Sequence, residues 1–204
     1  MKEQYIKLLK STKRQGINNL IKYLESSDFF TAPASSIYHG SYAGGLLEHS
    51  LNVYNCLVYE YENLKDSDFN LPNIPEDSLI IVSLLHDVCK VNCYVESTRN
   101  VKNEQTGQWE KVPIYKREPL FPMGHGGKSV FIAQQFIQLS PEEAQAIYWH
   151  MQAYDLSNYN TLNELSQANN ENLLCFLLGQ ADMKATYITE NERYQKPIEK
   201  SSKK

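Results

Sequence analysis

The sequence has no apolar run long enough to cross a membrane and no excess of basic residues. Its amino terminus, MKEQYIKLLKSTKRQ, is charged and lacks the apolar stretch of a secretory signal. The formal net charge is −4, which excludes an overall positive field that would draw the chain to nucleic acid or a membrane surface. We therefore expect a cytoplasmic protein with no membrane partner. Any anionic substrate must then be attracted locally, by a metal ion or by a few Lys and Arg side chains.

Cysteine is also scarce, and its spacing matches neither a disulfide framework nor a complete zinc site. Cys89 and Cys93 are four residues apart, but no second pair accompanies them to complete a structural zinc site. The sequence therefore favours reduced, mostly buried thiols in a reducing compartment. The four thiols are Cys56, Cys89, Cys93 and Cys175.

Most of the chain has apolar residues at helical spacing, which predicts an all-α fold. At 204 residues it is long enough for one sizeable domain, and hydrophobic residues make up 42% of it, enough to build a core. The polar stretch 157–172, SNYNTLNELSQANNEN, is predicted to be a loop. Helices are predicted at 3–12, 16–26, 45–63, 76–90, 125–138, 141–153 and 170–187.

Residues 92–118 interrupt the helical pattern. Two β-prone segments, CYVESTRNVK and WEKVPIYKRE, flank the turn-like stretch NEQTGQ, which predicts a β-hairpin inserted between helices. One interpretation of its basic and aromatic residues is a lid that binds a nucleotide by stacking and phosphate pairing, with Arg99 and Arg117 as substrate contacts. The alternative is a solvated edge or an oligomer contact.

Two adjacent ionisable residues, His86 and Asp87, follow helical turns that are wholly apolar. Burying two such groups is costly unless they are paired or bind a metal. Neighbouring residues on a helix diverge by about 100°, so both side chains can reach one metal only at the helix end or through a converging carboxylate. An Asp oxygen that bridges two ions, beside an imidazole bound to one of them, fits that geometry.

His49 lies on a helix face that is otherwise apolar, and Asp182 lies inside a strongly hydrophobic helix. A buried, unpaired carboxylate at Asp182 would be strongly destabilising. An ion pair is the alternative to a metal, but the helix offers only Lys184, which is expected to point elsewhere. His125, between glycines, and His150, near a helix end, have weaker local context. Each of these two fits a metal ligand and an ordinary histidine equally well.

Together these residues resemble the extended H…HD…H…H…D pattern of the HD superfamily of metal-dependent phosphohydrolases. The local strings YHGSYAGGLLEHS, LLHDVCK, GHGGKS, AIYWHM and GQADMKAT are similar to HD-domain segments and stand in the family's order. The resemblance covers roughly residues 28–188. The residues that match the pattern are His49, His86, Asp87, His125, His150 and Asp182.

The resemblance implies an HD-domain helical bundle, interrupted by the hairpin of 92–118, with a binuclear metal centre. The first ion would be held by His49, His86, Asp87 and Asp182. The second ion would be held by Asp87, His125 and His150. Mixed imidazole and carboxylate ligands suit Fe, Mn, Zn, Co or Ni, and the sequence does not choose among these metals.

Two further residues acquire roles from the resemblance and, with Asp87, are the expected catalytic residues. Lys90 matches the lysine of an HDxxK pattern and is expected to contact phosphate or a metal-bound oxygen; the alternative is a cation that caps the helix. His39 lies in a YH-containing stretch that, in some HD-type phosphodiesterases, protonates the leaving oxygen. It is equally well explained as a loop histidine that caps the bundle.

The implied function is that of a hydrolase acting on ester bonds, a phosphohydrolase or phosphodiesterase that uses a metal-activated hydroxide. The expected partner is a small phosphorylated molecule, with a nucleotide favoured over nucleic acid, and the sequence favours no oligomeric state. Two alternatives stay open: a non-catalytic, metal-bound ligand-sensing domain and a 3′–5′ nuclease accessory domain. We expect one HD-type domain over 1–204, with N-terminal helices at 1–27, the HD core at 28–188 and a flexible tail at 189–204.

Overall fold

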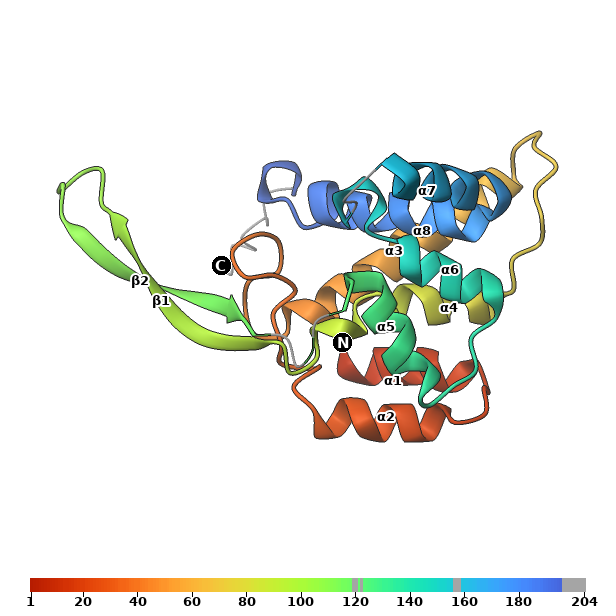
Figure 1. The fold of residues 1–204 in the computed structure, drawn as a ribbon, viewed down its shortest axis with the longest axis horizontal. Helices are drawn as coiled ribbons and strands as arrows, with labels where there is room; N and C mark the ends of the chain where they lie inside the picture. The colour runs from red at the N-terminus through yellow and green to blue at the C-terminus, as the bar shows by residue number, and fades with distance from the viewer. Residues whose placement is uncertain (119–120, 122, 156–158, 196–204) are drawn as a thin grey trace, which may run out of the picture.

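A computed structural model, which describes residues 1–118, 121, 123–155 and 159–195, shows a helical body from which one β-hairpin projects (Figure 1). In the described part, no helix combines the length and the apolar character needed to cross a membrane. The α-helices are α1 Lys2–Ser11, α2 Ile17–Ser26, α3 Gly45–Lys65, α4 Glu76–Leu85, α5 His125–Gln134, α6 Pro141–Trp149, α7 Tyr159–Glu171 and α8 Leu173–Lys184.

Helix α4 lies at the centre of the body because its sequence is apolar nearly all round. Every residue in the range 78–85 is buried. Its first turn carries Glu76 and Asp77, acids that suit the positive end of the helix dipole. Helices α1, α3, α6 and α8 all pack against it. The helix predicted over 76–90 therefore exists, but it ends earlier and gives way to a 3₁₀ turn, η1 Val88–Lys90.

A buried charge cluster, here named the Arg14 cluster, joins the connection between α1 and α2 to α4 and α6. Glu143 is fully buried and forms a capping box with Ser140 at the start of α6. The Arg14 guanidinium donates to both carboxylate oxygens of Glu143 and, through Nε, to Asp77 Oδ2 at 2.8 Å. Ser78 Oγ donates to Glu143 Oε1 at 2.6 Å. The cluster thus fixes the N-terminal helices on the core.

The segment 157–172, predicted to be a loop, instead contains helix α7, Tyr159–Glu171. Leu165 and Ala168 lie three residues apart and are buried, and α7 packs against α6 and α8. The loop prediction was wrong because Asn and Ser lower helix propensity, whereas a short apolar stripe is enough once a neighbouring helix covers it.

The predicted β-hairpin is confirmed. Strands β1 Tyr94–Lys102 and β2 Trp109–Arg117 pair antiparallel, in register from Tyr94 opposite Arg117 to Lys102 opposite Trp109. Figure 1 shows the two strands leading away from the helical body. An isolated two-stranded sheet is only marginally stable in water. At its base, the hairpin is held by the backbone bond from Tyr115 N to Ser36 O, 3.4 Å.

Candidate metal centre

All five histidines of the chain form one continuous cluster. Ring centroids are 4.7 Å apart for His39 and His49, 5.3 Å for His49 and His86, 4.9 Å for His86 and His150, and 5.3 Å for His150 and His125. They come from five places in the chain: the loop before α3, the second turn of α3, the end of α4, the end of α6 and the start of α5. Their convergence is therefore a property of the tertiary fold.

Asp87 lies within this cluster and divides it. Its Oδ2 is 3.4 Å from His86 Nε2 and 3.7 Å from His49 Nε2. Its Oδ1 is 2.6 Å from His125 Nε2 and 3.5 Å from His150 Nε2. One buried carboxylate therefore separates four imidazoles into two pairs, one beside each oxygen.

The end of α4 explains how adjacent residues reach the same site. His86 keeps helical backbone angles, with φ −53° and ψ −36°. Asp87 has φ −106° and ψ 14°, close to the bridge region where many active-site residues lie. The backbone changes direction between the two residues, so both side chains turn into the cluster. Adjacent residues can do this because the helix ends here.

Asp182 completes the first pair from helix α8. Its Oδ1 lies 3.1 Å from His49 Nε2, and His49 Nε2 lies 3.4 Å from His86 Nε2. Lys184, the cation on the same helix, pairs instead with Glu60 on α3. The expectation that Lys184 points away from Asp182 is therefore confirmed.

Three histidines whose Nε2 atom faces the cluster are held in place by a hydrogen bond at Nδ1. His86 Nδ1 and His150 Nδ1 are each bonded to the backbone carbonyl three residues earlier, at 2.8 and 2.7 Å. His49 Nδ1 is bonded to Glu190 Oε1 at 2.9 Å. Such bonds place the proton on Nδ1 and turn the Nε2 lone pair inward, as in metal-binding histidines. His150 Nε2 is buried and has no hydrogen-bond partner among the described residues.

The carboxylates of the cluster remain ionised despite their burial. Burial raises the pKa of Asp87, but Lys90, whose Nζ lies 2.5 Å from Oδ2, acts together with the neighbouring histidines to hold that pKa well below its usual range. Burial likewise opposes ionisation of Asp182, and the contact with His49 lowers its pKa overall. For His49, burial lowers the pKa, while Asp182 and Glu190 raise it to about 10. In the metal-free protein, a proton therefore occupies a position for which a cation would compete.

The donor atoms suit a metal ion. Four groups of three side chains bring their ligand atoms within 4.8 Å of one another, and three of these groups contain all six residues predicted as ligands. Imidazole nitrogen and carboxylate oxygen together suit divalent transition metals. The three groups are His49, His86 and Asp182; His86, Asp87 and His150; and Asp87, Cys89 and His125.

Two glycines allow the elements of the centre to approach one another. A Cβ atom at Gly126, next to His125, would lie 2.0 Å from a backbone oxygen of α6, so the start of α5 packs directly on the end of α6. A Cβ atom at Gly45 would lie 2.0 Å from the backbone oxygen of Gly40, so the loop that carries His39 presses on the start of α3. Any larger residue at either position would push a histidine away from the cluster.

His39 is at one end of the cluster, beside His49. Its Nε2 is buried and makes no hydrogen bond within the part of the chain that the structure describes. Burial and the neighbouring His49 lower the pKa of His39 to about 4, so its imidazole is neutral at pH 7. A role as proton donor therefore requires a bound anion to raise this pKa.

The hairpin brings one of its two candidate arginines to the cluster. Arg117 is at the base of β2, with Nη2 3.5 Å from His125 Nδ1. Arg99 lies opposite Val112, five positions beyond Tyr94 along β1, where the strand is exposed and leads away from the body (Figure 1). The structure therefore places Arg117, and not Arg99, with the histidines.

Sequence reasoning missed two residues of the site. Glu190 fell in the predicted flexible tail 189–204, yet its side chain is only 6% exposed and contacts His49. Cys89 Sγ lies 3.5 Å from both ring nitrogens of His125, and burial raises the pKa of its thiol to about 12. All four cysteines are buried and free, as expected. No local pattern marks either residue, because Glu190 follows a helix end and Cys89 fits an ordinary core thiol.

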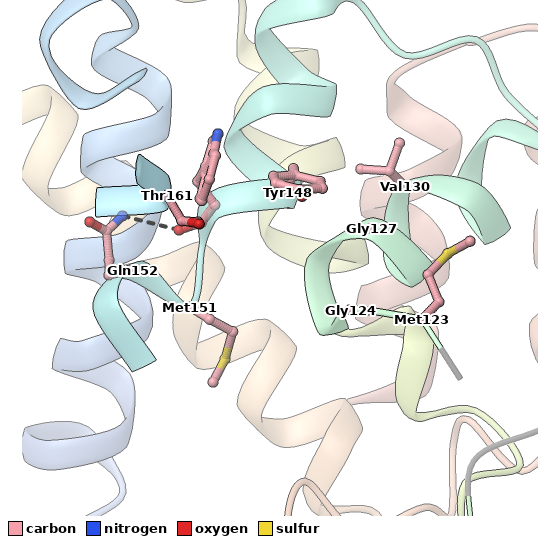
Figure 2. A pocket seen from close by; sticks show the side chains of 9 residues that line it. Met123, Gly124, Gly127, Val130, Tyr148, Met151, Gln152 and Thr161 are labelled. Carbon is pink, nitrogen blue, oxygen red and sulfur yellow. Dashed lines mark hydrogen bonds between the residues drawn. The ribbon is translucent and has the colours of Figure 1, made fainter. Parts of the chain in front are cut away.

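A cavity of about 370 Å³ is bounded by the start of α5, the end of α6 and the start of α7 (Figure 2). Its lining includes Gly124, which precedes His125, and Trp149 and Met151, which flank His150 in the sequence. Most of the lining is apolar or aromatic, with a few polar groups such as Gln152, as is usual for small-molecule sites.

Comparisons with protein-family models, with curated proteins and with solved structures found no match to this chain.

Proposed function

We propose that the protein is a metal-dependent phosphohydrolase of the HD superfamily that acts on a nucleotide or a related phosphate ester at a binuclear centre. The observation that carries this proposal is the division of four histidines into two pairs by the two oxygens of Asp87. That division supports an arrangement in which the Asp87 carboxylate would lie between two ions. As the resemblance in sequence implies, the ligands would be His49, His86, Asp87 and Asp182 for the first ion and Asp87, His125 and His150 for the second.

Such a centre supplies Lewis acidity, which polarises a phosphoryl oxygen and makes water a stronger acid at neutral pH. The chain supplies positive charge beside it. Lys90 is buried next to Asp87, and Arg117 lies beside His125. These two side chains are the candidates for binding the phosphate and stabilising the charge that builds on its oxygens. In a chain of net charge −4, they provide the local attraction that an anionic substrate needs.

His39 is the candidate for protonating the leaving oxygen. It is neutral in the free protein, because its pKa is lowered to about 4 by burial and by His49. A bound phosphate adds negative charge and raises the pKa of a neighbouring imidazole. His39 would then take up a proton when substrate binds and donate it through Nε2, the atom that has no partner among the described residues.

The cavity beside α6 supports a substrate with a planar group attached to the phosphate. Tyr148 and Trp149 contribute aromatic rings to its lining, and Met123 and Met151 contribute flexible thioethers (Figure 2). Aromatic and methionine side chains make favourable contacts with flat, polarisable rings. A volume of about 370 Å³ falls in the range of small-molecule sites. These features favour a nucleotide over a simple phosphate monoester.

The proposal is tested by metal analysis combined with a substrate panel of nucleotides, cyclic nucleotides, dinucleotides and single-stranded RNA. We expect two ions per chain and hydrolysis of a nucleotide substrate, both lost in Asp87→Ala. A metal-loaded protein that hydrolyses no phosphate ester would support the ligand-sensing alternative. Cleavage of RNA alone would support the nuclease alternative.

A further inference from the structure

One buried carboxylate of the centre, Glu190, lies outside the H…HD…H…H…D pattern. It directly follows a single turn of π-helix, Ala185–Thr189, that continues α8. Its backbone nitrogen donates to Ala185 O at 2.9 Å, the five-residue spacing of a π turn. Such turns often occur at functional sites. The wider turn brings the side chain of Glu190 against helix α3, where it is 6% exposed.

Glu190 contacts two residues of α3 through the same oxygen. Its Oε1 accepts from His49 Nδ1 at 2.9 Å and from Asn52 Nδ2 at 3.0 Å. His49 and Asn52 are three residues apart and therefore lie on the same face of the helix. Asn52 thus holds the carboxylate in place while the carboxylate holds the imidazole.

This bond decides which ring nitrogen of His49 faces the metal centre. With Nδ1 bonded to Glu190, Nε2 is turned toward Asp182 Oδ1, 3.1 Å away. The corresponding partners of His86 and His150 are neutral backbone carbonyls on their own helices. The partner of His49 alone among these three is charged and comes from a different part of the chain. A carboxylate partner also makes a metal-binding imidazole more basic.

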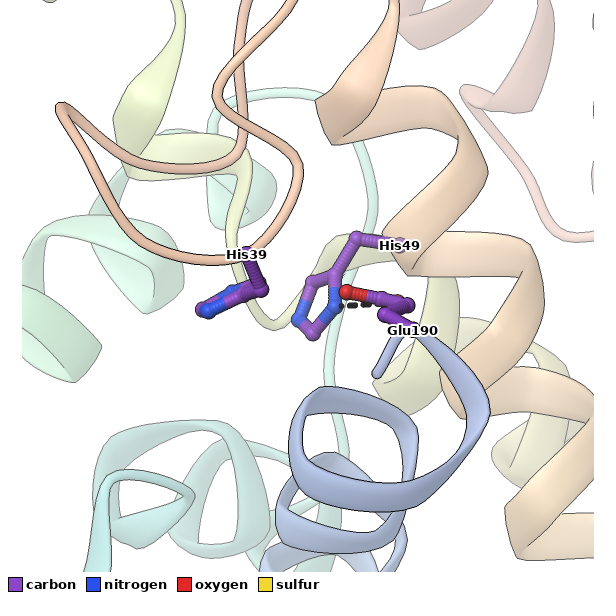
Figure 3. A group of neighbouring side chains, drawn as sticks. All are labelled: His39, His49 and Glu190. Atoms are coloured by element: carbon purple, nitrogen blue, oxygen red, sulfur yellow. Dashed lines mark hydrogen bonds and ion pairs between the residues drawn. The ribbon is translucent and has the colours of Figure 1, made fainter. Parts of the chain in front are cut away.

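His39, His49 and Glu190 do not form a separate cation site, although their ligand atoms lie within 4.8 Å of one another. Figure 3 shows Glu190 and His39 on opposite sides of the His49 ring. Nδ1 of that ring is already bonded to Glu190, and its Nε2 is turned toward Asp182. An ion between all three side chains would have to replace the bond from His49 to Glu190.

We propose that Glu190 is a positioning residue, which fixes the tautomer and the ring orientation of His49 and thereby raises the affinity of the first metal site. This inference rests on the proposed metal centre. If Glu190 has this role, the π turn after α8 contributes to the metal centre by placing Glu190 against His49.

Titration of Co²⁺ into the metal-free full-length protein tests this role, because cobalt reports both affinity and ligand geometry through its visible absorption. We expect Glu190→Ala to weaken the tighter Co²⁺ site by about 10- to 100-fold, the usual effect of losing such a partner, and to change its absorption spectrum. Glu190→Gln keeps an acceptor for His49 Nδ1 without the charge, so we expect a smaller loss of affinity and a nearly wild-type spectrum. Glu192→Gln, exposed and two residues further on, is the control and should bind as the wild type does.

Wild-type affinity and spectrum in a folded Glu190→Ala variant would overturn the inference. If Glu190→Ala does not fold, Glu190→Leu, which keeps bulk but offers no acceptor for His49 Nδ1, takes its place, and wild-type affinity and spectrum in that variant would likewise overturn the inference. Failure of the wild-type protein to bind Co²⁺ at all would instead contradict the metal centre itself. The two failures are therefore distinguishable.

Discussion

Two clusters of buried charge in the described part of the chain, the Arg14 cluster and the candidate metal centre, are completed differently. In the Arg14 cluster, each oxygen of Glu143 accepts two hydrogen bonds: Oε1 from Arg14 and Ser78, and Oε2 from Arg14 and the backbone nitrogen of Ser140. In the metal centre, by contrast, three buried atoms have no hydrogen-bond partner among the described residues. They are His39 Nε2, His150 Nε2 and Glu190 Oε2.

This difference separates a structural cluster from a binding site. Buried polar atoms in folded proteins are nearly always hydrogen-bonded, and each exception needs an explanation. The Arg14 cluster is satisfied by the protein alone, so it can serve the fold alone. The candidate metal centre gathers imidazoles and carboxylates around buried atoms that have no partner among the described residues, which is the arrangement expected where a cation and a substrate bind.

The largest effect should follow from changing Asp87, because its two oxygens separate the two histidine pairs. In Asp87→Asn, one oxygen becomes an amide nitrogen that cannot bind a cation. We expect loss of bound metal and a fall in phosphoesterase kcat on the order of 10³-fold, measured by metal analysis and steady-state kinetics. Asp77→Asn makes the same chemical change in the Arg14 cluster and should leave both unchanged. Equal activity of the two variants would contradict the distinction between the clusters.

The reverse test is made in the Arg14 cluster. Glu143→Ala leaves the Arg14 guanidinium without its buried partner, and breaking such a pair costs about 3–5 kcal/mol of the free energy of unfolding. Urea unfolding measures this loss. The neighbouring exposed Glu142 provides the matched variant, and Glu142→Ala should cost less than about 1 kcal/mol. The metal content of folded Glu143→Ala should match the wild type; a loss of metal would show that the two clusters are coupled.

Adding metal should raise the free energy of unfolding only by binding at the candidate metal centre. At a free metal concentration of about 100 times Kd, binding to the folded state alone contributes roughly 2.7 kcal/mol. We expect this gain in the free energy of unfolding when metal is restored after chelation. It should be smaller in His150→Ala, which loses a ligand of the second ion, and should persist in Glu143→Ala. A gain that is unaffected in His150→Ala would place the bound ion elsewhere.

The sequence predicted which histidines and carboxylates converge better than it predicted the elements around them, for a physical reason. Histidines and acids in apolar helical turns are costly unless they meet a partner, so His86, Asp87 and Asp182 stand out from their local sequence. His125 and His150 do not, because a glycine-flanked turn and a helix end accommodate ordinary histidines too. Only their order along the chain suggested them, and the structure then brings both to Oδ1 of Asp87.

The features that were missed depend on tertiary contacts that leave no local pattern. Helix α7 is stabilised by packing of Leu165 and Ala168 against its neighbours, not by the helix propensity of its many Asn residues. Glu190 reaches His49 only because a π turn follows α8. For the hairpin, the sequence predicted the strands but not their direction, and direction decides which arginine reaches the site.

The two arginines of the hairpin give the finest test of what belongs to the centre. Arg117 lies 3.5 Å from His125 and pairs with Tyr94, the first residue of β1. Arg99 lies five positions further along β1 than Tyr94. A charge-assisted hydrogen bond contributes about 1.5–3 kcal/mol, so Arg117→Ala should raise KM for a nucleotide substrate roughly tenfold or more. Arg99→Ala should leave KM unchanged. An equal rise in both variants would mean that the whole hairpin bends over the bound substrate, and it would restore the lid interpretation for Arg99.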